Sequence, residues 1–421
     1  MKFRFCSPSI LKSRIWTINL TNCRGDSTLE INVLLLSIDL GHMAHRVHYL
    51  DSFLARRGVN TKVLDISFRH EPQSTFKFLK NILFFPCIAS KSSNRTILFP
   101  SLPSIGHNAN NSNAFVHFAF SFLEFILVRI ISRSVNYNVI VATDPISAFV
   151  ANAARTSNTF FVYEYLDFYE DLQSGKTRSR FIYLLEKAAL KRADLVVSVS
   201  KPLEERARQI NPNCILVPNG ANLGYFTNPH LPREPCIIYA GSIVDWAGLA
   251  VPIKGFSILK KKIPSITMKI VGDGKEKHEL EILVQNLSLE DSVFFTGKLP
   301  YGEMADLLCK SSLGLAMFKP SKAAAFASPL KLFDYMAAGL PIIATDIGDI
   351  GRILRESYSG FAIKWDVEEF VKAAETLLTK QNIWLSFHEK GLCYVKKYSW
   401  DKLFDYWLME IKNRLKQRSK A

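Results

Sequence analysis

The sequence predicts an α/β protein with two doubly wound parallel-sheet domains that face each other across a cleft. Buried strand patterns alternate with helical patterns along most of the chain, which is typical of parallel sheets covered by helices on both faces. The alternation stops at residues 226–235, a Pro-rich polar linker, and then begins again. The 421 residues are enough for two domains of about 200 residues each.

Apolar runs bounded by turn residues predict the strands of the first domain. These runs cover residues 31–42, 61–67, 137–145, 159–165, 193–200 and 213–220, with helical spacing at 46–57 and 180–192. Residues 68–114 are polar and rich in Ser and Asn, and they give no clear assignment. We expect this N-terminal domain to span residues 29–227.

The second alternation predicts a C-terminal domain over residues 235–397. Its strand patterns are residues 236–242, 267–274, 293–299 and 313–318, followed by a loop, helix and strand over 328–345. Residues 398–421 predict a final helix that packs toward the N-terminal domain. In open parallel sheets, ligands bind beyond the carboxyl ends of the strands, so the loops there should carry the function.

The chain is basic, with a net charge of +15. Residues 1–226 hold 26 Lys and Arg against 16 Asp and Glu, so most of the excess lies in the N-terminal half. Such a surface favours a phosphorylated substrate or anionic lipid. No helix-turn-helix, zinc-finger or RNA-binding signature is present in the sequence, so we expect no nucleic-acid partner.

The seven cysteines are scattered and never spaced as C-x-x-C, which favours a reducing compartment and disfavours structural zinc. Residues 1–28 form a basic extension without a signal-peptide pattern, and either disorder or contact with a membrane surface fits them. The apolar stretch 115–133 contains Glu124 and Arg129, so it predicts a buried helix or an interfacial helix and not a membrane span.

The segment SPLKLFDYMAAGLPIIAT, residues 328–345, carries the most chemical information. Ser328 is a good N-cap, Pro329 suits the first helical position, and Gly339 suits the helix end. A helix start presents free N–H groups, and Lys331 one turn in would add a cation for a phosphate or diphosphate. Asp334 could accept hydrogen bonds from sugar hydroxyls. An ordinary capped helix that leads into a strand is the alternative.

The succession AGS, VGDG, FTGKLPYGEM and SPLKLFDYMAAGLPIIAT resembles the C-terminal domain of retaining GT-B glycosyltransferases of family four (group 1). EKAALKRADLVVSVSKPLEERA and ILVPNGANLGYF resemble the end of that family's N-terminal domain. The resemblance covers residues 190–350 well and implies two Rossmann-like domains. It also implies transfer of a sugar from a nucleotide-sugar donor, UDP- or GDP-linked, to an acceptor on the N-terminal domain. Neither a metal nor another cofactor is implied.

The resemblance also implies roles for individual residues. The helix start faces the donor diphosphate, Asp334 holds the nucleotide ribose, and Gly41 lets backbone approach the donor. Gly272 and Lys298 border the nucleotide base. The donor-binding residues expected in this way are Gly41, Ser242, Gly272, Lys298, Ser328, Pro329, Leu330, Lys331 and Asp334.

Three departures from the family pattern stand out. The first Glu of the family's E-x7-E motif falls on Phe326. The usual phosphate-binding Arg and Lys fall on Ser242 and Ala247, and Lys254 could substitute only if the loop were reshaped. The usual His after the strand at 159–165 falls on Leu166.

Asp167, which follows Leu166, is our candidate catalytic residue, with a polar or base role toward the acceptor, and a solvated acid is the alternative. His42 and His45 are candidates for the acceptor side, although either can be an ordinary loop or helix histidine. Without an obvious nucleophile, retention fits same-face attack assisted by the leaving phosphate.

The resulting hypothesis is a cytoplasmic glycosyltransferase, peripheral at the inner membrane face, that acts on a glycan or lipid-linked acceptor and contacts an anionic membrane surface. The alternatives are a non-catalytic family member that serves as a binding or scaffold subunit, and a nucleotide-sugar epimerase on the same fold.

Overall fold

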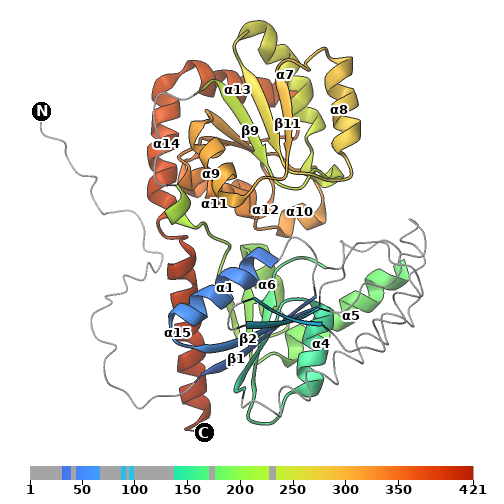
Figure 1. Ribbon diagram of the computed structural model, residues 1–421, viewed down its shortest axis with the longest axis vertical. Helices are drawn as coiled ribbons and strands as arrows, with labels where there is room; N and C mark the ends of the chain where they lie inside the picture. The colour runs from blue at the N-terminus through green and yellow to red at the C-terminus, as the bar shows by residue number, and fades with distance from the viewer. Residues whose placement is uncertain are drawn as a thin grey trace, which may run out of the picture. The chain divides into compact units, whose positions relative to one another are not determined.

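The computed structural model describes residues 31–38, 44–66, 87–91, 94–98, 137–169, 176–226 and 234–420. These residues belong to one compact unit, Ile31–Ala421. They form two six-stranded sheets, each with helices around it (Figure 1). All strand pairs within both sheets are parallel, which confirms the predicted α/β class.

The first sheet has the strand order β2-β1-β5-β6-β7-β8. Its central strands are buried on both faces, which explains their continuous apolar runs. Its strands are β1 (Asn32–Ile38), β2 (Asn60–Ile66), β5 (Val139–Ala142), β6 (Phe160–Tyr165), β7 (Leu195–Ser198) and β8 (Cys214–Leu216). Its helices are α1 (Ala44–Arg56), α4 (Pro145–Ala154), α5 (Lys176–Arg192) and α6 (Lys201–Arg208).

The second sheet has the order β11-β10-β9-β12-β13-β14. Strands are added toward one edge from β9 to β11 and toward the other edge from β12 onward, so the strand order switches between β9 and β12. Ligands bind beyond the carboxyl ends of the strands at such a switch point. The strands are β9 (Cys236–Ala240), β10 (Thr267–Val271), β11 (Val293–Gly297), β12 (Leu313–Ala316), β13 (Ile342–Thr345) and β14 (Gly360–Ile363). The helices are α7 (Ala250–Lys262), α8 (Lys277–Asn286), α9 (Tyr301–Lys310), α10 (Lys322–Phe326), α11 (Leu330–Ala337), α12 (Gly348–Ser357), α13 (Val367–Thr379) and α14 (Gln381–Val395), with short 3-10 turns η2 (Leu223–Tyr225) and η3 (Asp245–Ala247).

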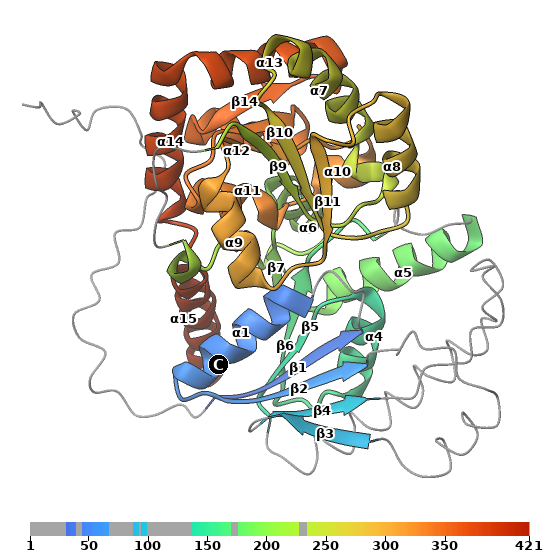
Figure 2. The ribbon, with the colours of Figure 1, turned by 45° about the horizontal axis from the view of Figure 1, so that its top comes forward.

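The region without a sequence assignment, 68–114, contains an antiparallel pair, β3 (Cys87–Lys91) and β4 (Asn94–Leu98) (Figure 2). The stretch 115–133 and the extension 1–28 lie outside the described residues. No helix in the described ranges is both long and apolar enough to cross a membrane.

The last helix, α15 (Trp400–Arg418), lies against α1 and the first sheet (Figure 1). Trp407 and Phe404 are fully buried in one apolar cluster with strand residues of that sheet. The chain therefore returns from the second domain to complete the core of the first.

A buried ion pair lies in the same cluster. The Nε of Arg46 donates to Glu164 at 2.8 Å, and Trp407 donates to the other carboxylate oxygen at 2.6 Å. Arg46 also donates to the carbonyls of Val217 and Pro218, and its guanidinium lies 5.5 Å from the ring centroid of Phe404. Each charge is therefore almost completely satisfied within the protein.

We expect Arg46→Met to lower the free energy of unfolding by about 3 kcal/mol, because Glu164 would remain buried without its cation. The matched control is Arg56→Met, which breaks an exposed pair with Asp401 and should cost less than about 1 kcal/mol. Scanning calorimetry of both variants is the measurement. If Arg46→Met and Arg56→Met melt at the same temperature, the buried pair contributes no more to stability than the exposed one, which would contradict this prediction.

Candidate functional site

The start of α11 presents unpaired N–H groups. The first residue with helical geometry is Leu330, and Pro329 precedes it with extended backbone (φ −68°, ψ 126°). Among the described residues, the N–H groups of Leu330 and Lys331 have no acceptor. This helix terminus can therefore receive an anion.

The prediction that Ser328 caps this helix is wrong. The helix begins one residue later than the sequence pattern suggested, since Pro329 takes the cap position, and no side chain of the described residues caps it. The Oγ of Ser328 is buried and finds no hydrogen-bond partner in the described part of the chain, and only 6% of the residue is exposed. Its carbonyl accepts a 2.6 Å hydrogen bond from Asn219 of the first domain.

Lys331 projects from the first turn of α11 toward aromatic faces. Its Nζ lies 4.0 Å from the ring centroid of Tyr239 and 5.2 Å from that of Phe318. No carboxylate pairs with it in the described part of the chain, and burial lowers the pKa of Lys331 to about 7. The charged form of a desolvated amine held by cation–π contacts is strongly stabilised when an anion binds beside it.

The loops after β9 and β10 approach each other closely beside Lys331. A Cβ on Gly272, whose φ is +136°, would lie 1.9 Å from the carbonyl oxygen of Gly241. A Cβ on Gly241 would lie 2.8 Å from the Nζ of Lys331. Only glycine fits at both positions, which leaves room for a ligand to approach backbone. Ser242 is half-buried, and its carbonyl accepts a hydrogen bond from Tyr239 at 2.6 Å.

Asp334 lies one turn after Lys331 and binds a tyrosine. The hydroxyl of Tyr301 donates to its Oδ1 at 2.7 Å. Burial raises the pKa of Asp334 to about 7, against the lowering effect of the Tyr301 hydrogen bond. Burial, followed by the charge of Asp334, raises the pKa of Tyr49 in α1 to about 12. Asp334 therefore lies where both domains contribute, with its Oδ2 unbonded among the described residues.

Asp167 follows the carboxyl end of β6. Burial raises the pKa of Asp167 to about 7, although part of the residue reaches solvent, and no partner binds its carboxylate among the described residues. The next residue, Phe168, stacks on Phe326 of the second domain, with ring centroids 4.7 Å apart. The stack places the loop of Asp167 beside the segment that leads into α11. Phe326, which replaces the expected first Glu, therefore makes an apolar contact between domains.

The other candidate residues lie as follows. Lys298 is exposed just after β11. Ala247 is buried in η3. Lys254 lies on α7, a different helix from that of Lys331, and is exposed. Gly41 and His42 lie outside the described residues. His45 lies in the first turn of α1, and its side chain is outside the described part.

Several residues around the site were missed by sequence reasoning. Tyr301 and the aromatic pair Trp246 and Phe318, stacked at 5.8 Å between centroids, flank the predicted donor residues. Trp246 lies five residues after Gly241, and its 45% exposure is unusual for a tryptophan. Asn219 and Ser200 carried no signal, because their contacts lie more than 100 positions away in sequence.

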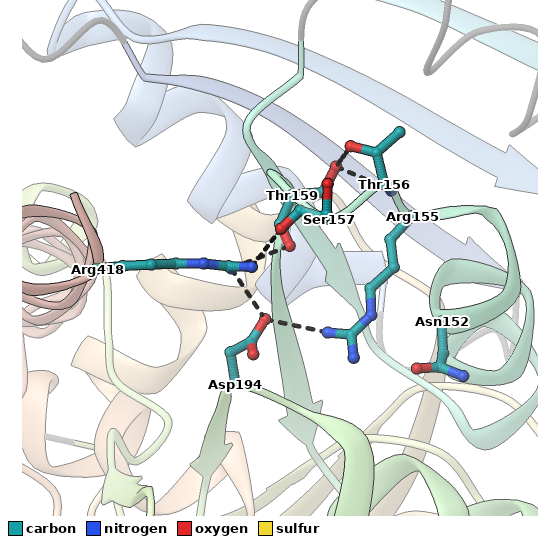
Figure 3. A pocket seen from close by; sticks show the side chains of 7 residues that line it. All are labelled: Asn152, Arg155, Thr156, Ser157, Thr159, Asp194 and Arg418. Carbon is teal, nitrogen blue, oxygen red and sulfur yellow. Dashed lines mark hydrogen bonds and ion pairs between the residues drawn. The ribbon is translucent and has the colours of Figure 1, made fainter. Parts of the chain in front are cut away.

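A polar pocket of about 350 Å³ lies elsewhere in the first domain (Figure 3). Asp194 precedes β7, and Thr159 precedes β6, so this pocket is at the amino ends of the strands. Arg155 and Arg418 meet at the Asp194 carboxylate, and Arg418 also donates to the carbonyls of Ser157 and Thr159. At this pocket, Arg418 holds the end of α15 against the first domain, remote from the start of α11.

Two family models match the chain. The model described as "Glycosyl transferase 4-like domain" matches residues 98–220, and the model described as "Glycosyl transferases group 1" matches residues 226–391. The two matches follow each other along the chain and meet at the linker.

Curated relatives are similar over part of their length. An uncharacterized glycosyltransferase of Haemophilus influenzae is 27% identical over 177 residues, which cover 41% of this chain and 47% of that protein. A phosphatidyl-myo-inositol mannosyltransferase of Mycobacterium leprae is 25% identical over 201 residues, which cover 45% and 50% respectively. The chain thus spans about half the length of these curated relatives.

Solved structures show the same fold over nearly the whole chain. Sucrose-phosphate synthase from Thermosynechococcus elongatus aligns with a TM-score of 0.72 at 18% identity, and the alignment covers 92% of this chain and 100% of that one. Anabaena HepE in complex with UDP and glucose aligns with a TM-score of 0.66 at 15% identity, over 91% and 99%. At these identities the likeness shows the architecture alone.

Proposed function

The chain belongs to the group 1 glycosyltransferases of GT-B fold, and from this premise we propose that it transfers a sugar from a UDP- or GDP-linked donor to a glycan or lipid-linked acceptor. The observation that carries the proposal is the start of α11. Free N–H groups and an unpaired, desolvated Lys331 occur together at the switch point of the second sheet. The similarly folded HepE contains UDP and glucose, which supports a nucleotide donor.

Sugar transfer builds negative charge on the departing diphosphate. Fixed N–H donors and a cation stabilise that charge without reorganisation during the reaction. Leu330 and Lys331 would supply the backbone donors, and the Lys331 ammonium would neutralise a phosphate oxygen. Because these groups supply the positive charge, we propose a reaction that needs no resident metal ion.

Asp334 and the glycine loops would hold the nucleoside. The unbonded Oδ2 of Asp334 can accept hydrogen bonds from ribose hydroxyls, while Tyr301 fixes the orientation of the carboxylate. Gly272 and Lys298 would border the base, and Ser242 would lie near the phosphates. His42 and His45, before and within the start of α1, stay candidates for the acceptor side.

Asp167 would accept the proton of the attacking hydroxyl. Its pKa of about 7 suits a base at neutral pH, because a substantial fraction is ionised there and the ionised form readily takes up a proton. Among the described residues no second acid perturbs this carboxylate, since burial alone raises its pKa. We therefore propose retention by same-face attack, in which the leaving phosphate assists.

A membrane location rests on charge alone. The excess of basic residues in the N-terminal half would favour the anionic inner face of a membrane, where a lipid-linked acceptor lies. Sedimentation with anionic vesicles at low and high salt tests this point. Binding that disappears at high salt is expected, and absence of binding at low salt would contradict it.

The direct test of activity is a donor screen followed by product analysis. One nucleotide-sugar should raise the melting temperature, and the chain should then move its sugar to an acceptor glycan with the anomeric configuration retained. Binding without transfer or hydrolysis of any donor would favour the scaffold alternative. Conversion of the donor sugar without an acceptor would favour the epimerase.

Donor affinity should fall as the pH rises above about 7. In the free protein the pKa of Lys331 is lowered, so the amine loses its proton in this range, whereas a bound diphosphate favours the charged form. Binding of UDP-glucose should therefore take up protons at alkaline pH, since the donor's diphosphate diester stays ionised. Calorimetry in buffers of different ionisation enthalpy measures this uptake. Lys331→Ala should abolish it, and unchanged uptake in that variant would contradict the assignment.

A further inference from the structure

The three residues that lead into α11 are held by the first domain. We call residues 326–328 the donor strap. The carbonyl of Phe326 accepts a 2.6 Å hydrogen bond from Ser200, and the carbonyl of Ser328 accepts one of 2.6 Å from Asn219. Both ends of the strap are therefore fixed by side chains from the opposite domain.

Ser200 is itself fixed in place. It is fully buried at the start of α6, where its Oγ accepts from the N–H of Leu203 at 3.3 Å while it donates to Phe326. The next backbone N–H, of Lys201, donates to the carboxylate of Asp349 in the second domain at 3.1 Å. The first turn of α6 thus binds the second domain at two points.

Asn219 is fixed by the buried ion pair of the first domain. Its Oδ1 accepts from Arg46 at 3.3 Å, while its Nδ2 donates to Ser328. Arg46 in turn is held by Glu164. The amide of Asn219 therefore accepts a hydrogen bond from Arg46 through its oxygen and donates one to the strap through its nitrogen.

The strap determines where the α11 start points. Pro329 has no N–H, so the first N–H groups available to a ligand belong to Leu330 and Lys331, two and three residues after Ser328. A rotation of the Ser328 peptide would redirect them. Electrostatic stabilisation depends on donors that are already aimed at the developing charge.

The geometry points to Ser200 and Asn219 as positioning residues for the donor diphosphate, which act by holding the strap carbonyls. This inference rests on the proposed function. It goes further because it makes the N-terminal domain a determinant of the donor site, through two side chains that hydrogen-bond to the strap carbonyls.

The experiment compares UDP binding by calorimetry in variants that separate the contacts. Asn219→Asp keeps an oxygen that accepts from Arg46 but replaces the N–H group that donates to Ser328. This variant should bind UDP about tenfold more weakly, the effect of one lost hydrogen bond. The matched control is Asn213→Asp, which adds the same charge to the same domain beside Arg414 and should bind UDP normally.

A second, uncharged comparison uses the serine. Ser200→Ala should weaken UDP binding about as much as Asn219→Asp, and Ser200→Thr, which keeps a hydroxyl, should restore it. Asp366→Ala removes a comparable cap from α13 and controls for the loss of a helix cap. It should leave UDP affinity unchanged.

The outcomes separate this inference from the proposed function. If the wild type binds neither UDP nor GDP, the proposed donor and this inference both fail, and if it binds GDP alone the same variants are compared with GDP. If the wild type binds UDP and Asn219→Asp and Ser200→Ala bind it equally well, only this inference fails. If Asn219→Ala weakens binding but Asn219→Asp does not, Asn219 acts through Arg46 and the strap contact is overturned.

Discussion

Replacement of Lys331 by alanine should reduce kcat/KM for sugar transfer by about 10²–10³, the effect of removing one preorganised donor to a developing charge. Lys331 is the cation that the first turn of α11 adds to its free N–H groups, and no described carboxylate competes for it. At Ser242 and Ala247, where the family resemblance implies further cations, this chain has uncharged residues, so we expect no second cation from these positions. Steady-state kinetics with the donor identified by screening is the measurement.

The matched control is Lys254→Ala. Lys254 is exposed on α7, and loss of its charge should leave kcat/KM within about twofold, since isolated surface charges contribute little. Arg in place of Lys331 should rescue activity only in part, because the fork-shaped guanidinium does not fit against Tyr239 and Gly241 as an ammonium does. If Lys254→Ala impairs transfer as much as Lys331→Ala, the diphosphate assignment is wrong.

Asp167→Asn should reduce kcat by about 10²–10⁴, the range for loss of a general base, while donor affinity stays unchanged. Asparagine keeps the size of the side chain and the Phe168–Phe326 stack, so the fold should not change. In the wild type, kcat should rise with pH through about 7, because the pKa of Asp167 is raised and only its ionised form accepts a proton.

The pH profile separates this role from a structural one. The variant should lose the rise in kcat near pH 7, whereas a carboxylate that only stabilises the fold would leave the shape of the profile intact. UDP binding by calorimetry serves as the internal control. A variant that transfers at the wild-type rate would remove Asp167 from the mechanism.

The central strands of both sheets were predictable, because a strand buried on both faces needs an unbroken apolar run. The edge strand β14, which is mostly half-buried, was not predicted. Val139–Ala142 and Leu195–Ser198 follow this pattern, and these two strands end three and two residues before the end of the predicted runs, whose last residues form the loops. The glycine at position 339, with φ +67°, ends α11 as its residue type indicated. Such local rules located the segment that we propose for donor binding.

The contacts that shape the site were not predictable from local rules. Serine is a common N-cap residue, but the extended backbone of Pro329 makes the helix begin at Leu330, and the hydroxyl of Ser328 is buried. Asn219, Ser200 and Tyr301 reach the site through contacts that depend on how the strands and helices assemble. Asp167 drew attention through its position after a strand, next to the residue where the resemblance implies a His, and its raised pKa depends on burial.

The most direct test of the central claim is a crystal structure of the chain with UDP. The account predicts the diphosphate at the start of α11, with its oxygens bonded to the N–H groups of Leu330 and Lys331 and to the Lys331 ammonium, and the ribose on Asp334. UDP bound elsewhere, such as beside Arg155 and Arg418 in the pocket of Figure 3, would contradict it.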